Sequence, residues 1–268
     1  MPAVRCSDIY DSAEARMEEE KSLQGIVLQA YDVRDSSRIV DLFTQERGKI
    51  SVLVRGAKRN KSRFLNLSAP YVEGQFHVVF GRSTNYLKEG TITDAHLGLR
   101  RSLAQLTAAR FGAEALLGVL TEGEERDLFL LFQAFLCAVE NGNVAQLSHG
   151  MAAYLLKLCS YSGFRPRIST CVYGGEPIEG DSVFFDLEAG GMACPVHAPS
   201  VGAEGLFAAE YAAIVRYLRL PLRAIMNARD FSSVDARRLA RISFRYYAMH
   251  TDRHSLGALS MMEELRLL

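Results

Sequence analysis

The sequence predicts an α+β protein in which a small β-barrel precedes a helical domain that a short β insertion interrupts. Polar and apolar residues alternate from Leu23 onward, apolar residues recur every three or four positions after Gly98, and glycine-rich sequence then breaks the helical pattern. A period of two is typical of strands and a period near 3.6 of amphipathic helices. The expected parts are an acidic, flexible tail over 1–22, a barrel over 23–97, and a helical domain over 98–268 with an insertion at 167–201.

Five segments of the barrel region have strand patterns. They cover residues 24–31, 38–44, 49–55, 71–80 and 86–95. The second and third are separated by Gln45-Glu46-Arg47-Gly48, in which Gly48 suits the positive φ of a tight turn, so they form a predicted hairpin. Five short strands in about 75 residues fit a small antiparallel barrel.

The second half of the chain has helical periodicity on both sides of the insertion. Helices are predicted over 102–120, 128–139, 151–161, 203–220 and 234–248. The third ends at Gly163 and Pro166, which are helix-stop signals. The first three have wide apolar faces, which predicts a buried bundle. Cys137 and Cys159 lie within these patterns and are expected to be buried free thiols.

Composition and motifs favour a non-enzymatic protein of the cytoplasm. Hydrophobic residues make up 49% and charged residues 23%, as in soluble globular proteins. No apolar run approaches the length of a membrane span, and no signal peptide is recognisable, so we expect a cytoplasmic location and no membrane contact. Phosphate loops, dinucleotide-binding glycine motifs and the His-Glu-x-x-His motif do not occur, so no catalytic residues are predicted.

A formal net charge of zero conceals two basic regions. Residues 34–63 contain nine basic and three acidic side chains, and residues 216–253 contain nine arginines and three aspartates. Residues 1–20 balance them with six acids against two bases. Clustered cations bind nucleic-acid phosphates and release counterions, so these regions are candidate DNA contacts. The candidate side chains are Arg47, Lys49, Arg55, Lys58, Arg59, Lys61 and Arg63 in the first region, and Arg237, Arg238, Arg241 and Arg245 on one side of a helix in the second. The alternative is that both are solvated surfaces, the second pairing with local acids.

Several motifs in order resemble the N-terminal domain of the RecO family. They are Gly25-Ile26-Val27-Leu28, the run from Asp35 to Thr44, Arg47-Gly48-Lys49-Ile50, Arg55-Gly56-Ala57-Lys58-Arg59 and Lys61-Ser62-Arg63. The similarity continues through Ser162-Gly163-Phe164-Arg165-Pro166, a cysteine-bearing insert and an arginine-rich helical end, and so extends from about residue 23 to the C-terminus.

The resemblance implies an OB barrel joined to an α-helical domain that carries a zinc-ribbon-like insertion. It implies binding of single- and double-stranded DNA, annealing of complementary strands and help in loading RecA onto DNA coated by single-stranded DNA-binding protein (SSB). RecR, the SSB tail and RecA would be partners, at the nucleoid, and no catalysis is implied. An OB barrel stacks bases on aromatic side chains, and Phe64 is favoured because it follows the basic residues. Lys157, Arg165 and Arg167 are candidate rim residues of an apolar groove for the SSB tail.

The cysteine pattern of the insert departs from the two Cys-x-x-Cys pairs common in the family. Gly174 stands where the second cysteine of the first pair would be, and His197 where that of the second pair would be. Cys171, Cys194 and His197 are thus three candidate zinc ligands, whereas structural zinc sites are almost always four-coordinate. No cofactor is therefore certain. The alternative is a metal-free remnant held by Val183, Phe184 and Phe185.

Two other functions fit the same residues. An OB-type RNA-binding module would carry the same basic and aromatic side chains, because recognition of the 2′-hydroxyl leaves no simple sequence pattern. A scaffold whose basic patches bind acidic protein tails would also have them, but it would not anneal strands.

Overall fold

The computed structural model describes residues 19–33, 36–59, 61–121, 123–179, 182–198, 202–231 and 234–268. Contacts divide the chain into two compact units, Met1–Leu42 with Ile50–Asp94, and Phe43–Lys49 with Ala95–Leu268. The predicted barrel over 23–97 stays a prediction, and by its contacts the hairpin tip, Phe43–Lys49, is grouped with the second unit. There the buried ring of Phe43 lies 5.5 Å from that of Phe129.

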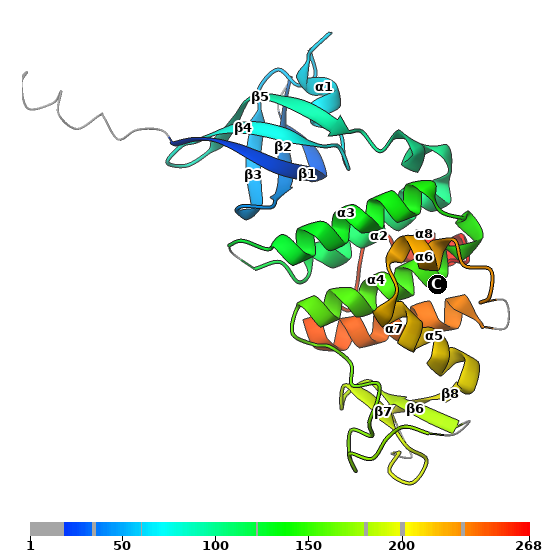
Figure 1. Ribbon diagram of the computed structural model, residues 1–268. Coiled ribbons are helices and arrows are strands. Elements are labelled where there is room, and N and C mark those ends of the chain that lie inside the picture. The colour runs from blue at the N-terminus through cyan, green and yellow to red at the C-terminus, as the bar shows by residue number, and fades with distance from the viewer. Residues whose placement is uncertain are drawn as a thin grey trace, which may run out of the picture. The chain divides into compact units, whose positions relative to one another are not determined.

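The first unit is a closed five-stranded barrel. Its strands are β1 (Glu19–Val33), β2 (Ser37–Thr44), β3 (Gly48–Val54), β4 (Glu73–Phe80) and β5 (Asn85–Asp94), with the short helix α1 (Phe64–Leu67) between β3 and β4. The strand order β1-β2-β3-β5-β4 closes where β4 pairs with β1 (Figure 1). A five-stranded closed barrel with this strand order is the OB fold, so the predicted OB barrel is confirmed.

Two details of the barrel differ from the sequence prediction. β1 begins at Glu19, because Glu19, Glu20 and Lys21 pair with the end of β4, so the predicted tail over 1–22 ends earlier and its remainder lies outside the described residues. β3 and β5 are parallel, although only Val52 and Leu53 take part in this pairing. Gly48 has the predicted positive φ, at 63°.

Alternating residues of the strands fill the barrel. The core is built from Leu23, Val27, Val40, Leu42, Val52, Val54, Ala57, Leu67, Phe76, Val78 and Leu87. Gly74 allows β4 and β5 to approach closely, since a Cβ at this position would lie 2.2 Å from the Thr91 carbonyl oxygen.

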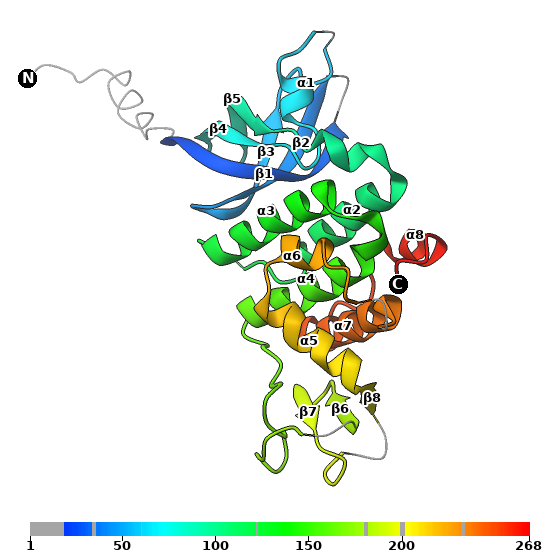
Figure 2. The same ribbon diagram turned by 45° about the vertical axis from the view of Figure 1, so that its right-hand side comes forward.

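The second unit is a helical bundle around α4. Its elements are η1 (Leu97–Arg101), α2 (Leu103–Leu117), α3 (Arg126–Asn141), η2 (Val144–Gln146), α4 (Leu147–Tyr161), α5 (Ala208–Arg219), α6 (Leu222–Met226), α7 (Ala236–Thr251) and α8 (Leu259–Glu264). Twelve of the fifteen α4 residues are buried, which makes α4 the central helix, packed against α2, α3, α5, α6 and α7 (Figure 2). Cys159 on α4 is buried as predicted, but Cys137 is exposed, because α3 turns neighbouring positions inward instead. Within the described ranges, no helix is both long and apolar enough for a membrane span.

Two of the buried polar side chains in the bundle, Tyr154 and His149, have hydrogen-bond partners. The Tyr154 hydroxyl donates to the Gly112 carbonyl oxygen at 3.0 Å. His149 Nδ1 is hydrogen-bonded to the Tyr217 hydroxyl, and its ring stacks on Phe231 with centroids 4.7 Å apart. Burial lowers the pKa of His149 to about 4, against a smaller opposing effect of Asp235, so the imidazole is neutral near pH 7.

The insertion contains a small antiparallel sheet of β7 (Gly191–Ala193), β6 (Ser182–Asp186) and β8 (Ala203–Phe207), in that order. The prediction of helix from residue 203 was wrong, because residues 203–207 pair along the whole of β6. Helix α5 starts only at Ala208, where the Phe207 N–H donates to Glu210 Oε2 at 3.0 Å. The sheet therefore extends beyond the predicted 167–201 and leads directly into the bundle.

Candidate nucleic-acid interface and cysteine cluster

The loop after β3, residues 55–63, is called the basic loop here. All five of its cationic side chains are exposed; they are Arg55, Lys58, Arg59, Lys61 and Arg63. Local hydrogen bonds shape it: the Arg59 N–H donates to the Gly56 carbonyl at 3.1 Å and the Ser62 N–H to the Arg59 carbonyl at 2.9 Å. The loop is therefore a series of turns that holds its cations outside the barrel core.

Three of these cations have partners in the barrel. The Arg55 guanidinium lies over the Tyr86 ring, 4.4 Å from its centroid. Lys58 forms an ion pair with Asp32 at 3.0 Å, and Arg63 donates to the Lys88 carbonyl at 3.3 Å. These contacts hold their side chains against the barrel.

Asp32 is the acid that organises one end of the basic loop. Besides Lys58, Arg38 forms an ion pair with Asp32 at 2.8 Å. The hydrogen bonds from these two cations lower the pKa of Asp32, and the one from Arg38 has the larger effect. Among the described residues, neither Arg59 nor Lys61 pairs with a carboxylate. Their charges face solvent, where they suit the phosphates of a single strand.

Two further predicted contacts on the hairpin fall outside this cluster. Arg47 and Lys49 lie in Phe43–Lys49, which belongs to the second unit. The Arg47 backbone N–H donates to Thr44 Oγ1 at 3.1 Å, within the hairpin turn. The barrel's own candidate interface therefore consists of the basic loop without Arg47 and Lys49.

The aromatic side chains near the basic loop are arranged differently from the expectation. Phe64, the favoured stacking residue, packs against the barrel core while Arg63 lies over its ring at 4.9 Å. Its ring is thus used within the protein. Tyr31 at the end of β1 is 49% exposed, which leaves more of its surface for a base.

The four arginines on α7 divide into two kinds. Arg238 donates to Glu210 Oε2 at 2.5 Å and to the Gly205 carbonyl at 2.6 Å, and Arg245 forms an ion pair with Glu204. These two match the alternative of a helix face that pairs with local acids. Arg237 and Arg241 are exposed, and they stay candidate contacts for an anionic partner.

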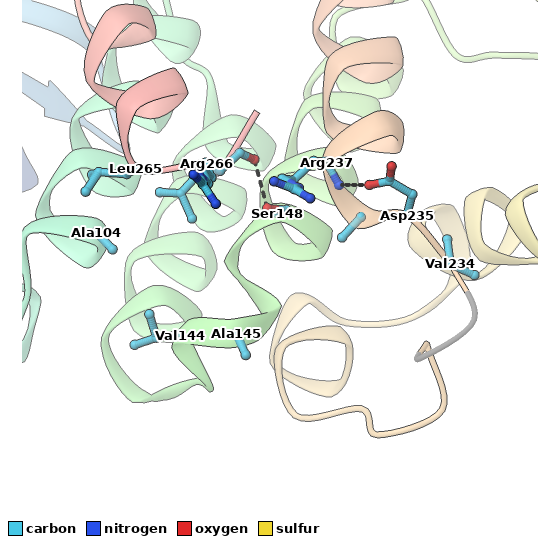
Figure 3. Close-up of a pocket in the computed structure, with 11 residues that line it drawn as sticks. Ala104, Val144, Ala145, Ser148, Val234, Asp235, Arg237, Leu265 and Arg266 are labelled. Carbon is cyan, nitrogen blue, oxygen red and sulfur yellow. Dashed lines mark hydrogen bonds between the residues drawn. The ribbon is translucent and has the colours of Figure 1, made fainter.

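A pocket of about 660 Å³ lies beside the start of α7. It is lined by Ala104, Val144, Ala145, Ser148, Val234, Asp235, Ala236, Arg237, Leu265, Arg266 and Leu267. In Figure 3, the side chains of Arg237 and Arg266 lie near Ser148, whose hydroxyl donates to the Leu267 carbonyl at 2.8 Å. The one acid of the lining, Asp235, accepts hydrogen bonds from the Arg237 and Arg238 backbone N–H groups. The two arginines and the apolar side chains beside them suit a short peptide that is both acidic and apolar.

The groove rim predicted from sequence is only partly formed. Arg165 and Arg167 line a smaller pocket of about 300 Å³ together with Phe164 and Tyr246. Lys157 instead donates to the Leu218 carbonyl at 3.1 Å and is half-buried. Arg266 was not predicted, since a single arginine near the C-terminus carries no pattern.

The structure brings the three predicted zinc ligands together and adds a fourth group. Cys171 Sγ lies 3.8 Å and Cys194 Sγ 3.2 Å from His197 Nδ1. Glu176 Oε1 lies 2.9 Å from Cys194 Sγ and 2.8 Å from His197 Nδ1. One donor atom from each of the four residues lies within 4.8 Å of the others.

The donor set fits a structural zinc ion. Zinc prefers sulfur and imidazole nitrogen and accepts carboxylate oxygen in tetrahedral sites. Burial raises the pKa of Cys171, but bonds from the backbone N–H groups of Gly174, Cys194 and Tyr173 outweigh it and lower that pKa to about 7. The hydrogen bond from the Cys194 thiol is the largest of the effects that lower the pKa of Glu176 to about 2. Sequence reasoning missed Glu176 because a glutamate five residues after a cysteine matches no ligand motif.

Comparisons with known proteins point to the same family over both halves of the chain. The model for "Recombination protein O N terminal" matches residues 17–96, and the model for "Recombination protein O C terminal" matches residues 100–260. The DNA repair protein RecO of Anaeromyxobacter sp. (strain Fw109-5) is 29% identical over 253 residues, which are 93% of this chain and 98% of that protein. That of Thermoanaerobacter sp. (strain X514) is 29% identical over 172 residues, 64% of this chain and 68% of that protein. That of Clostridium acetobutylicum is 33% identical over 151 residues, 55% and 60% of the two chains.

Proposed function

The chain belongs to the RecO family, and on this premise we propose that it is a non-enzymatic recombination mediator that binds single- and double-stranded DNA and anneals complementary strands. The family places the chain in DNA repair and recombination, with DNA and proteins of that pathway as its partners. Work on chromosomal DNA would place it at the nucleoid in the cytoplasm.

The basic loop on an OB barrel is the observation that carries this proposal. Five exposed cations follow one another within nine residues, and Arg55 and Arg63 also cover aromatic rings. Such a surface binds the phosphates of any sequence and leaves base edges unread. A protein that anneals arbitrary strands needs this indifference to sequence.

Annealing requires that two strands of like charge approach each other. The basic loop would neutralise one strand, and the exposed Arg237 and Arg241 of α7 offer cations for another. Neither surface needs ATP or a reacting group, which agrees with a mediator that brings strands together without chemical change.

The pocket that contains Arg237 and Arg266 is our candidate for the acidic, apolar C-terminal tail of SSB. The two arginines would bind carboxylates, and Val144, Leu265 and the neighbouring alanines would contact apolar side chains. Binding the tail would bring the protein to SSB-coated DNA. Contact with RecR and loading of RecA are the later steps that the family resemblance implies.

The test of the proposal is the annealing of two complementary labelled oligonucleotides by the purified full chain, without ATP and across a salt series. We expect fast annealing that weakens steeply with salt, because counterion release drives binding. Absence of both binding and annealing at low salt would refute the proposal and favour the scaffold. Preference for RNA over a matched DNA oligonucleotide in competition would favour the RNA-binding module.

The tail site has its own test. A labelled peptide with an acidic, apolar C-terminus should bind the native chain and bind the Arg237→Gln/Arg266→Gln variant several-fold more weakly. The matched control is Arg165→Gln/Arg167→Gln, which removes two cations from the smaller pocket. If only the control variant loses binding, the tail docks at the smaller pocket instead.

A further inference from the structure

The cysteine cluster of the insertion shows how this chain departs from the four-cysteine pattern without losing a fourth ligand. In the Cys171-Val172-Tyr173-Gly174 turn, Gly174 occupies the position of the second cysteine. The turn itself is intact: the Gly175 N–H donates to the Cys171 carbonyl at 3.0 Å, and the Cys171 N–H to the Glu176 carbonyl at 2.8 Å. The backbone is therefore still shaped to direct residue 174 toward the cluster.

The Glu176 carboxylate fills the space in front of Gly174. A Cβ built on Gly174 would lie 2.0 Å from Glu176 Oε2 and 2.6 Å from His197 Cε1. A side chain at position 174 would thus point directly at these two groups. The carboxylate stands where the missing thiol would be, and it could not stand there if residue 174 carried a side chain.

We propose that this insertion binds one Zn²⁺ through Cys171, Cys194, His197 and Glu176, with Glu176 replacing the ligand that Gly174 lacks. The inference concerns the insertion alone and is independent of DNA binding. It changes the three-ligand prediction from sequence into a closed four-ligand site, which is the form typical of structural zinc.

The geometry of the four donor atoms is compatible with an ion. Bonds of about 2.0–2.3 Å in a tetrahedron give distances of roughly 3.3–3.8 Å between donor atoms. The distance between Cys171 Sγ and His197 Nδ1 is already 3.8 Å. Glu176 Oε1 lies 2.8 Å from His197 Nδ1 and 2.9 Å from Cys194 Sγ, and Cys194 Sγ lies 3.2 Å from His197 Nδ1, so these donors would have to move apart by only about half an ångström.

Charge and exposure also fit this exchange of ligands. Two thiolates and one carboxylate carry the same charge as three thiolates, so the complex with Zn²⁺ keeps the net charge that a site of three cysteines and one histidine would have. Cys171 is fully buried, whereas the Glu176 and His197 side chains are 41% and 42% exposed. The harder oxygen ligand therefore lies on the solvent side of the site, where a carboxylate is easily accommodated.

The experiment compares four forms of the full chain: native, Glu176→Ala, Gly174→Cys/Glu176→Ala, and the control Glu179→Ala. Glu179 is an exposed glutamate of the same insertion. Removal of Glu176 takes away the closest obstacle to a cysteine at 174, and the half-exposed His197 ring, whose Cε1 would lie 2.6 Å from the new Cβ, has to shift as well. Gly174 does not have a positive φ, so with that shift the double variant should rebuild a site of three cysteines and one histidine. Zinc content after dialysis, Co²⁺ spectra and the melting temperature with and without EDTA are measured for each form.

We expect one zinc per chain in the native and Glu179→Ala forms, and an affinity reduced about tenfold or more in Glu176→Ala. Recovery is expected in the double variant, with sulfur-to-cobalt charge-transfer absorption about one and a half times the native value, because three thiolates replace two. EDTA should lower the melting temperature only of the forms that bind zinc. Metal content is the readout even if Glu176→Ala alone unfolds the insertion, since the double variant then decides. The proposal is overturned if the native chain binds no Zn²⁺ or Co²⁺, if Glu176→Ala binds as tightly as the control, or if the double variant regains nothing.

Discussion

Neutralising two cations of the basic loop should change the salt dependence of DNA binding by a calculable amount. The perturbation is Arg59→Gln/Lys61→Gln. In the described structure these two exposed side chains pair with no carboxylate, so their removal leaves the ion pairs of the barrel intact. An effect on DNA binding can then be separated from an effect on folding.

The magnitude follows from counterion release. Each phosphate contact on a single strand contributes about −0.7 to the slope of log affinity against log salt. If all five cations of the basic loop contact phosphates, the slope is about −3.5, and without Arg59 and Lys61 it is about −2.1. Raising salt from about 50 to about 200 mM should then weaken binding about 130-fold for the native chain and about 20-fold for the variant.

Fluorescence anisotropy of a labelled oligothymidylate gives the affinity at each salt concentration. The matched control is Arg100→Gln/Arg110→Gln, which removes two exposed arginines of the helical unit outside both basic regions. Its slope should equal that of the native chain. An unchanged slope in Arg59→Gln/Lys61→Gln would refute the assignment of the basic loop to phosphate binding, whatever happens to the affinity at a single salt concentration.

Three further outcomes concern stability. Burial holds the pKa of His149 at about 4, whereas in the unfolded chain its pKa is near 6.5, so the unfolded chain takes up the proton first as pH falls. The free energy of unfolding, measured by urea titration, should therefore drop by up to about 2 kcal/mol between pH 7 and pH 5. His149→Gln should abolish most of this pH dependence. Tyr154→Phe should cost about 1 kcal/mol by loss of a buried hydrogen bond, whereas Tyr161→Phe, at an exposed position, should be neutral by the same titration. Arg238→Gln leaves the buried Glu210 carboxylate without its cation and should cost about 1–2 kcal/mol while leaving the salt slope of DNA binding unchanged; the reverse pattern would make Arg238 a DNA contact.

The spacing of apolar residues predicted the strands and most helices, because an element that is buried on one face needs apolar side chains at regular intervals. The five barrel strands and the helices α2, α3 and α4 lie where the alternation and the helical spacing placed them. The misassigned segment Ala203–Phe207 shows the limit of this reasoning. Its composition suits a helix as well as a strand, and only pairing with β6, which lies about twenty residues earlier in the sequence, decides between them.

The sequence predicted which residue types form the candidate site, but not which side chains they contact. The basic loop could be read from the sequence, whereas the ion pair of Asp32 with Lys58 and the segregation of Arg47 and Lys49 depend on contacts between distant strands and units. Glu176 is the clearest case. A family pattern predicts ligands only at its own positions, here at residue 174. Glu176 reaches the same point in space from two residues farther along the chain, and only the folded turn shows this.

The short pairing between β3 and β5, called the seam here, has a consequence for local unfolding of the barrel. Only Val52 with Asn85 and Leu53 with Tyr86 form its register, whereas β1 and β4 share eight pairs. Local unfolding begins where few backbone bonds must break together, so amide hydrogen exchange should be faster along this seam than between β1 and β4. Arg55 lies over Tyr86 across it. A DNA strand that contacts Arg55 would therefore bind beside this short β3–β5 pairing, and its binding should slow amide hydrogen exchange there.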